Sequence, residues 1–304
     1  MPESRTQRIH NHEGLEVSPE LLESTISFFR KRDYDFISLD QLPEYQQANK
    51  KKFVIFTFDD GYLDNYEIAY PILKKHHVPF TIYVTTGLPD GHAFLWWYLL
   101  EDLILKNNSL ELEMDGRSVK FKTGSHKEKE IAFNQVRSVL AVADKAGLDS
   151  YKTNMFGNFK NESAQLTQSL SMSWGQIEEL AKDPLVTIGS HTVNHYPLKS
   201  LTEVESKFEM IECKKIIEAH IKKEVNHFCY PIGSYSQREV TLAGSCGYRS
   251  ATTINMSNFF QDHFAHPFAI PRIMINALTT EKLLTLQVNG LLPFIRNKGR
   301  RIVI

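Results

Sequence analysis

The chain has 304 residues, of which 42% are hydrophobic, so it is long enough to bury a sizeable core. Its 35 basic and 36 acidic residues give a net charge of -1, which argues against nucleic acid as the main partner. This length is long for a single β-sandwich and normal for an α/β barrel with an insertion.

The cysteines and the first residues of the chain indicate the cellular compartment in which we expect the protein. Cys213, Cys229 and Cys246 are odd in number and widely spaced, without a CxxC pair, and we interpret them as reduced thiols. The start, MPESRTQRIHNHEG, lacks the apolar segment of a secretory signal, and no run of about 18 apolar residues predicts a membrane span. We therefore expect a cytoplasmic protein. The basic run at 296–301 could touch a membrane surface, although a solvated terminus is its commoner meaning.

The first third of the chain predicts helices alternating with strands. Ser18 and Pro19 form a helix start, and the helix is expected to end near Arg32. Such alternation favours a parallel sheet. The further elements that we expect here are strands at Phe36–Leu39, Phe53–Phe58 and Phe80–Thr85 and helices at Asp40–Tyr45 and Asn65–His77.

Residues 92–172 break this alternation, and we predict that they form a subdomain inserted into one domain of residues 1–304. They contain a helical FLWWYLLEDLIL segment, a hairpin around Asp115-Gly116, and a charged helical stretch at 126–147. Trp96 and Trp97 could form a platform for a sugar ring, because aromatic faces suit pyranoses. The other reading is that at least one of them belongs to the core, since leucines accompany them at helical spacing.

The alternation resumes after Trp174 and completes about seven strand-helix units. This count predicts an α/β fold of the distorted (β/α)7 type, whose sites lie where the strands end. We expect strands at Val186–Ile188, His227–Tyr230, Tyr248–Thr253 and Ile270–Ile275, and helices at Gln176–Lys182, Glu203–Ile221, Gln237–Cys246 and Glu281–Phe294.

Two of these strands run directly into metal-binding side chains. FVIFTFDDG ends in Asp59 and Asp60, and VTIGSHTVNH ends in His191 and His195. We expect the His-x3-His pair on one helical turn, with both rings on the same face. Two His and one Asp are a common ligand set for a catalytic divalent ion. Each motif alone has a commoner meaning, a turn or cap for Asp-Asp and a solvated helix face for His-x3-His, but the two together favour a site.

These segments resemble a known family. TFDDG, SHTVNH and the later FCYPIGSY are similar to motifs of the polysaccharide deacetylases with the NodB homology domain, carbohydrate esterase family 4. The resemblance extends from VSPELLE near Val17 to PRI at Pro271–Ile273 and is weak between the first two motifs. Relatives usually carry a strand ending in Tyr-His-Arg or Phe-His-Arg before the VSPELLE segment. We therefore expect that the natural start lies upstream of the one given.

The resemblance implies roles for several residues. Asp60, His191 and His195 would hold the metal ion, Asp59 would be the general base, and the amide of Ile232 would stabilise the oxyanion. Zinc is the expected ion, with cobalt, nickel, manganese and iron as alternatives, because this ligand set accepts them all.

Two departures from the family pattern remain. Cys229 stands where many members have an arginine that orients the base, and Arg272 could supply that charge unless it forms a structural salt bridge elsewhere.

The acid that protonates the leaving amine is the second departure. The last strand lacks the histidine of many relatives, although His263 and His266 lie upstream of it. The candidates are His266, His10, His12 and a histidine upstream of the given start. We favour the upstream histidine, because the rest of the chain follows a branch of the family that uses one.

The sequence therefore predicts a metal-dependent hydrolase that removes N-acetyl groups from an amino sugar in a polysaccharide or in its precursor. The partner would be a carbohydrate, and no nucleic acid is expected. Within the enzyme class the alternative is an O-deacetylase or deformylase acting on a sugar. From another class the alternative is a catalytically silent carbohydrate-binding homologue, although such a protein would have no need of Asp59 beside a complete ligand set.

Overall fold

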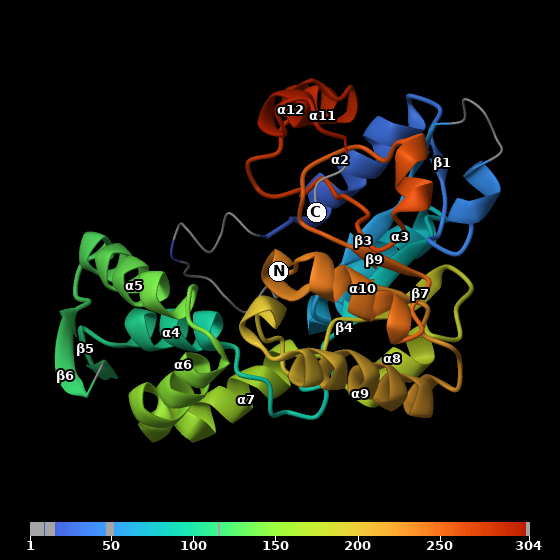
Figure 1. Ribbon diagram of the computed structural model, residues 1–304. Coiled ribbons are helices and arrows are strands. Elements are labelled where there is room, and N and C mark those ends of the chain that lie inside the picture. The colour runs from blue at the N-terminus through green and yellow to red at the C-terminus, as the bar shows by residue number, and fades with distance from the viewer. Residues whose placement is uncertain (1–8, 10–15, 47–51, 115, 302–304) are drawn as a thin grey trace.

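A parallel sheet forms the centre of the protein. The computed structural model describes residue 9 and residues 16–46, 52–114 and 116–301 (Figure 1). Five parallel strands lie in the order β3-β4-β7-β8-β9, namely β3 (Phe56–Phe58), β4 (Phe80–Val84), β7 (Val186–Ser190), β8 (His227–Cys229) and β9 (Ser250–Thr252).

The sheet continues at both edges. β1 (Asp35–Phe36) pairs in parallel with β2 (Phe53–Val54), and Ile55 alone separates β2 from β3. At the other edge, Ile270 forms a parallel bridge with Thr252. The five-stranded parallel sheet makes a half-barrel, which confirms the predicted α/β barrel class.

Helices cover the outer face of the sheet. They are α2 (Pro19–Arg30), α3 (Tyr70–Lys75), α8 (Trp174–Leu180), α9 (Glu203–Ile221) and α10 (Gln237–Ser245). The central strand β4 is fully buried: Phe80, Ile82 and Val84 pack among these helices, while Tyr83 points into the barrel interior with Cys229 and Ile270. α11 (Glu281–Val288) and α12 (Leu291–Arg296) follow, and Leu284 of α11 packs against α2.

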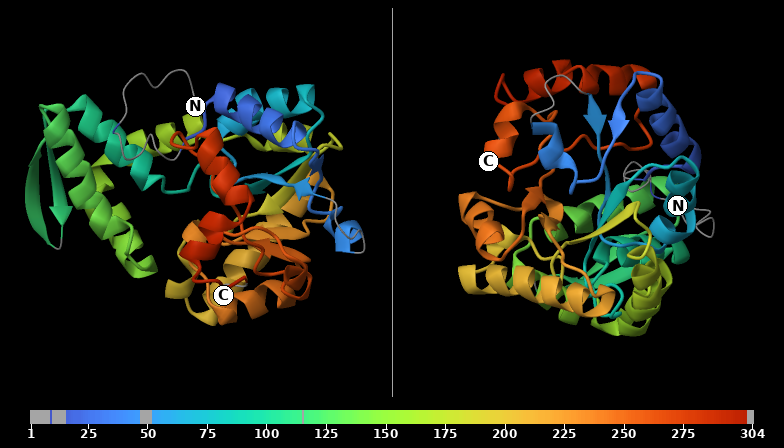
Figure 2. Two further views of the ribbon diagram at one scale, coloured as in Figure 1. Left: turned by 90° about the horizontal axis from the view of Figure 1, so that it is seen from above. Right: turned by 90° about the vertical axis from the view of Figure 1, so that its right-hand side faces the viewer.

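The region that interrupts the alternation forms its own apolar cluster. It contains α4 (Trp96–Lys106), the antiparallel pair β5 (Ser109–Met114) and β6 (Arg117–Lys122), α5 (His126–Leu140), α6 (Lys145–Ser150) and α7 (Lys160–Leu170). Leu99, Phe133 and Val136 are buried in this cluster. Figures 1 and 2 show these elements together at one side of the barrel. The division into a domain and an insertion at 92–172 stays a prediction, and we call this region the insertion.

Three predicted elements differ from the structure. The last strand is reduced to the bridge at Ile270, after which the Arg272 N–H donates to the Asn255 carbonyl over 3.1 Å. The closing helix divides into α11 and α12 because Gly290 adopts a left-handed backbone with φ of 86°. The predicted Asn65–His77 helix begins as a wide turn over Asn65–Ala69 before α3.

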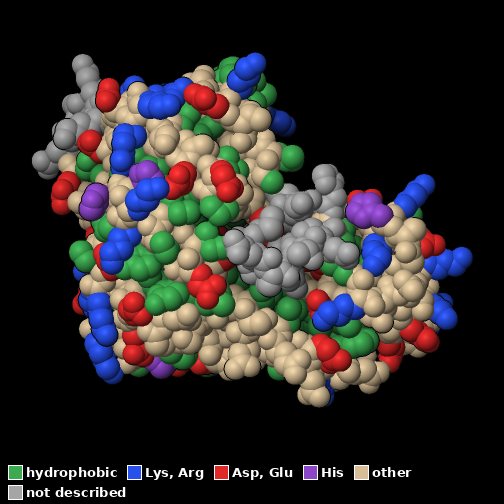
Figure 3. All heavy atoms as spheres, turned by 180° about the vertical axis from the view of Figure 1, so that it is seen from behind, with side chains coloured by type: hydrophobic (Ala, Val, Ile, Leu, Met, Phe, Trp, Pro, Cys, Tyr) green, Lys and Arg blue, Asp and Glu red, His purple; other side chains and the backbone are tan. Residues whose placement is uncertain are grey.

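The surface shows no single dominant charge on the face drawn in Figure 3, where acidic and basic side chains are interspersed. Within the described ranges, no helix combines the length and the apolar character needed to cross a bilayer.

Gly189 allows β7 to approach Tyr83 on β4. A Cβ atom at this position would lie 2.5 Å from Tyr83 Cδ1, and Tyr83 is fully buried. Gly189→Ala is therefore expected to lower the free energy of unfolding by about 1–3 kcal/mol in urea denaturation. Gly175→Ala in α8 is the control, because its Cβ would meet only Ser173 Oγ at 3.9 Å. Equal stability of the two variants would contradict this packing argument.

Candidate active site

The paired aspartates follow β3 on a turn of unusual backbone conformation. Asp60 has φ of 72° and Gly61 has φ of 90°, and the Gly61 N–H donates to the Asp59 carbonyl over 2.9 Å. A non-glycine residue in this region carries backbone strain that surrounding contacts must offset. This turn directs Asp59 and Asp60 to different neighbours.

Backbone N–H groups just after β4 donate hydrogen bonds to the aspartate turn and to the loop of His191 and His195. The Thr85 N–H donates to the Asp60 carbonyl over 3.1 Å, and the Thr86 N–H donates to the Thr192 carbonyl over 3.2 Å. The Gly87 N–H donates to the Val193 carbonyl over 2.9 Å, and a Cβ on Gly87 would lie 2.7 Å from that oxygen. β4 lies between β3 and β7, so one strand end holds the aspartate turn and the histidine loop together.

The histidine motif is a tight loop, so the predicted helical turn is wrong. Residues 191–195 form no helix, and Thr192 and His195 have left-handed φ values of 69° and 59°. The His195 N–H donates to Thr192 Oγ1 over 3.0 Å. The loop still brings the two imidazoles together, with ring centroids 5.0 Å apart.

Asp60, His191 and His195 converge on one point. Asp60 Oδ1 lies 3.2 Å from His195 Nε2 and 3.5 Å from His191 Nε2. His191 Nδ1 lies 2.7 Å from the Cys229 carbonyl, so Nδ1 carries the proton and the Nε2 lone pair faces Asp60. Asp60 Oδ1 is buried and has no hydrogen bond within the described part of the chain. This donor set, with an unsatisfied carboxylate oxygen at its centre, fits a divalent cation.

Electrostatics keep Asp60 ionised. Burial raises the pKa of its carboxyl group, but the charge of the adjacent His195 ring outweighs burial and holds that pKa below its usual range.

Arg272 lies against Asp59. Its Nη1 and Nη2 donate to Asp59 Oδ1 and Oδ2 over 2.6 and 2.8 Å, in a bidentate pair. Arg272 Nε is held by the Thr253 carbonyl at 2.9 Å, and Nη2 also lies 3.0 Å from Cys229 Sγ. Although burial raises the pKa of Asp59, the charge and hydrogen bonds of Arg272 keep it well below its usual range. The structure thus places Arg272 where the sequence analysis expects a substitute for the missing arginine.

The Pro231–Gly233 turn brings Ile232 to the cavity. Ile232 is half-exposed, has φ of 48° and lines the same cavity as the aspartates. Gly233 is required here because its φ is 66° and a Cβ would lie 2.2 Å from Ile254 Cγ1. With Asp60, Thr192 and His195, Ile232 is one of four non-glycine residues around the site with positive φ.

His266 lies away from this centre, which corrects the expectation that it acts there. It is exposed and directly precedes Pro267, whose carbonyl accepts from the Ala251 N–H in β9. The chain passes Ile270 before it reaches Arg272, so His266 lies toward the amino end of β9. His263 is buried beside Phe259. The other two candidates, His10 and His12, lie outside the described residues.

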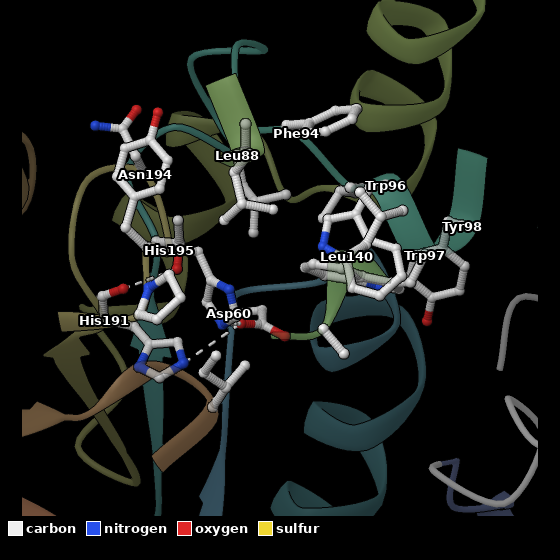
Figure 4. A pocket seen from close by; sticks show the side chains of 18 of the residues that line it. Asp60, Leu88, Phe94, Trp96, Trp97, Tyr98, Leu140, His191, Asn194 and His195 are labelled. Carbon is white, nitrogen blue, oxygen red and sulfur yellow. Dashed lines mark hydrogen bonds and ion pairs between the residues drawn. The ribbon is translucent and has the colours of Figure 1, made fainter. Parts of the chain in front are cut away.

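A cavity of about 600 Å³ opens at this site, between the barrel and the insertion (Figure 4). Trp97 packs on the His195 ring with centroids 5.6 Å apart. Trp96 also lines the cavity and packs against the insertion cluster, so it has core contacts, while the sugar platform stays a prediction.

Several contacts around the site were not predicted. Glu209 of α9 is buried, and its Oε2 accepts from the Val193 and Asn194 N–H groups, each over 2.9 Å. Tyr196, next to His195, donates to Asp149 Oδ1 of the insertion over 2.5 Å. The position of Tyr196 next to His195 could have marked it as a residue near the site. Nothing in the sequence distinguishes Glu209 from the other glutamates of its helix.

Comparisons with known proteins agree with this geometry. The family model described as polysaccharide deacetylase matches residues 46–146 and 157–251. YxkH of Bacillus subtilis, whose name assigns it to this class, is 23% identical over 248 residues, which is 81% of this chain and 61% of that protein. The poly-beta-1,6-N-acetyl-D-glucosamine N-deacetylase of Staphylococcus aureus is 36% identical over 86 residues, 28% of this chain and 29% of that protein. The matches thus span less than two thirds of either relative.

Solved structures share the fold. The Streptococcus pyogenes deacetylase PplD, in complex with acetate, aligns with a TM-score of 0.60 and 18% identity over 95% of this chain and 92% of its own. IcaB from Ammonifex degensii aligns with a TM-score of 0.54 and 16% identity over 90% of each chain.

Proposed function

We propose, since this chain belongs to the polysaccharide deacetylase family, that it is a metal-dependent hydrolase that removes N-acetyl groups from an amino sugar. The observation that carries the proposal is the convergence of Asp60, His191 and His195 beside the Asp59–Arg272 pair, at one wall of a cavity. The name of the Staphylococcus aureus relative supports N-acetylglucosamine as the sugar to test first.

Asp60, His191 and His195 would hold the ion, with zinc as the first candidate. When bound, a divalent ion polarises the amide carbonyl and lowers the pKa of water from about 16 toward about 7. The hydrogen bond from His191 to the Cys229 carbonyl fixes the ring and leaves Nε2 free to ligate.

Asp59 would accept the proton of the attacking water. Its side chain is 32% exposed while both oxygens are held by Arg272, so it is ionised, oriented and still accessible. Each carboxylate oxygen keeps a lone pair for the water.

The Ile232 N–H would stabilise the oxyanion of the tetrahedral intermediate. The left-handed backbone of Ile232 turns this residue to the cavity, and no other described residue accepts a hydrogen bond from its N–H. A backbone donor fixed before reaction loses no orientation energy at the transition state. The same site would also serve an O-acetyl or N-formyl group, so the acyl group needs its own assay.

Arg272→Met is expected to lower kcat for acetate release by about 10–100-fold while metal content stays at the wild-type level. The substitution removes the bidentate partner that orients Asp59, and a misplaced base is a poor catalyst. Steady-state kinetics and metal analysis measure the two effects. Arg249→Met is the control, because Arg249 is exposed and pairs only with Glu224 among the described residues. Full activity with an unchanged pH profile would remove Arg272 from the mechanism.

Calorimetric titration of zinc into the chelated protein tests the proposed metal site. We expect one ion per chain, and loss of that binding in His191→Ala. Unchanged zinc affinity in this variant would contradict the ligand assignment, because His191 supplies one of three ligand atoms.

A further inference from the structure

The cavity continues beyond the metal ligands into the insertion. Its barrel side carries Asp60, His191 and His195, and its opposite side is built from α4, α5, α6 and the segment before α4. Figure 4 shows Leu88, Phe94, Trp96 and Leu140 around the space that faces the ligands. One continuous space therefore joins the chemistry to the insertion.

Part of the insertion side of this space is apolar. We define the insertion subsite by five lining residues: Phe94, Trp96, Phe133, Leu140 and Leu148. Phe133, Leu140 and Leu148 are buried in the protein yet line the cavity, so the space reaches the apolar interior of the insertion. Charged residues also line this side: Arg137 and Lys152, which are exposed, and Asp149, which is partly exposed.

Two contacts fix the insertion subsite relative to the metal ligands. Trp97 packs on the His195 ring, and the Tyr196 hydroxyl donates to Asp149, the residue after Leu148. Lys145 pairs with the other Asp149 oxygen at 3.1 Å. The insertion subsite thus adjoins the loop of His195, and a sugar bound at the ligands would have a substituent within its reach.

We propose that the insertion subsite binds an apolar chain attached to the amino sugar, an alkyl or acyl group, rather than a further sugar of a glycan. This inference rests on the proposed deacetylase function. A second sugar would bury hydroxyl groups against Phe133, Leu140 and Leu148, whose side chains offer no hydrogen bonds, and this costs free energy. An apolar chain gains up to about fourfold in affinity for each methylene removed from water.

Acetate release from the methyl and octyl β-glycosides of N-acetyl-D-glucosamine tests the proposal. We expect kcat/KM at least tenfold higher for the octyl glycoside, a gain that about two buried methylenes would supply. Equal kcat/KM for both glycosides would overturn the insertion subsite and leave the deacetylase function standing.

Ala141→Trp and Val142→Trp provide a matched pair of variants. Ala141 lines the cavity at the exposed end of α5, whereas Val142 is 82% exposed and does not line it. Ala141→Trp is expected to reduce the ratio of kcat/KM for the octyl and methyl glycosides to below threefold, without changing turnover of the methyl glycoside. Val142→Trp is expected to keep this ratio at the wild-type value. The same ratio in both variants would contradict the proposed location of the insertion subsite.

A binding measurement tests the insertion subsite independently of the proposed deacetylase activity. If neither glycoside releases acetate, calorimetry with the zinc-loaded protein still measures octyl glycoside binding below its micellar concentration. Saturable binding that Ala141→Trp weakens at least tenfold would support the insertion subsite, and no binding to the unsubstituted protein would overturn it.

Discussion

Replacing Asp59 with Asn is expected to lower kcat for acetate release by about 10²–10⁴-fold, the usual contribution of a general base. Asn has nearly the same shape but cannot take the proton of the water. Asp60, His191 and His195 are unchanged, so zinc affinity should stay within about threefold of the wild-type value. Kinetics and zinc calorimetry on the same preparation measure both quantities.

Asp33→Asn is the matched control for this experiment. Asp33 is exposed, has φ of 56°, which asparagine accommodates, and forms no ion pair with another described residue. The control should keep wild-type kcat. More than a tenth of wild-type activity in Asp59→Asn with metal bound would contradict the role of Asp59 as the base.

Replacing Glu209 with Ala is expected to weaken zinc binding by about 10–100-fold and to lower the free energy of unfolding by about 2–4 kcal/mol. Glu209 is 4% exposed, and its carboxylate accepts from the Val193 and Asn194 N–H groups and from Asn194 Nδ2. Its removal leaves three donors unsatisfied in the loop between His191 and His195. Zinc calorimetry and urea denaturation measure the two losses.

Two further variants sharpen the test of Glu209. Glu209→Gln keeps one acceptor oxygen and should lie between Glu209→Ala and wild type. Glu212→Ala, on the same helix at a partly exposed position, should change neither quantity appreciably, because Glu212 pairs only with Lys215 among the described residues. Wild-type zinc affinity in Glu209→Ala would show that the loop holds its shape without this carboxylate.

The sequence was most informative where a strand runs into a metal-binding side chain. Apolar periodicity located β3, β4 and β7, and parallel strands bring their carboxyl ends to one edge, so Asp60 and His191 could be expected together. The sequence also offered Arg272 as the charge that replaces the missing arginine, but not its bidentate contact with Asp59.

Other features depend on contacts that no local pattern encodes. Two histidines four residues apart would lie on one face of a helix. The loop after β7 brings them together without a helix, because Thr192 and His195 adopt left-handed conformations and are joined by a hydrogen bond. Glu209 and Asp149 act through tertiary contacts, so their positions within a helix carry no sign of them. His266 was one candidate for the acid because it lies near the last strand, but that strand reaches the site only at Arg272.

Acetate release from N-acetylglucosamine oligosaccharides, measured on the full chain before chelation, after chelation and after zinc or cobalt is returned, tests the central claim most directly. The account predicts that release falls to background on chelation and returns with one equivalent of metal. Release that persists with the metal removed would contradict metal dependence. No release with metal bound stoichiometrically, across N-acetyl, O-acetyl and N-formyl sugars, would contradict the enzyme and favour a silent carbohydrate-binding homologue.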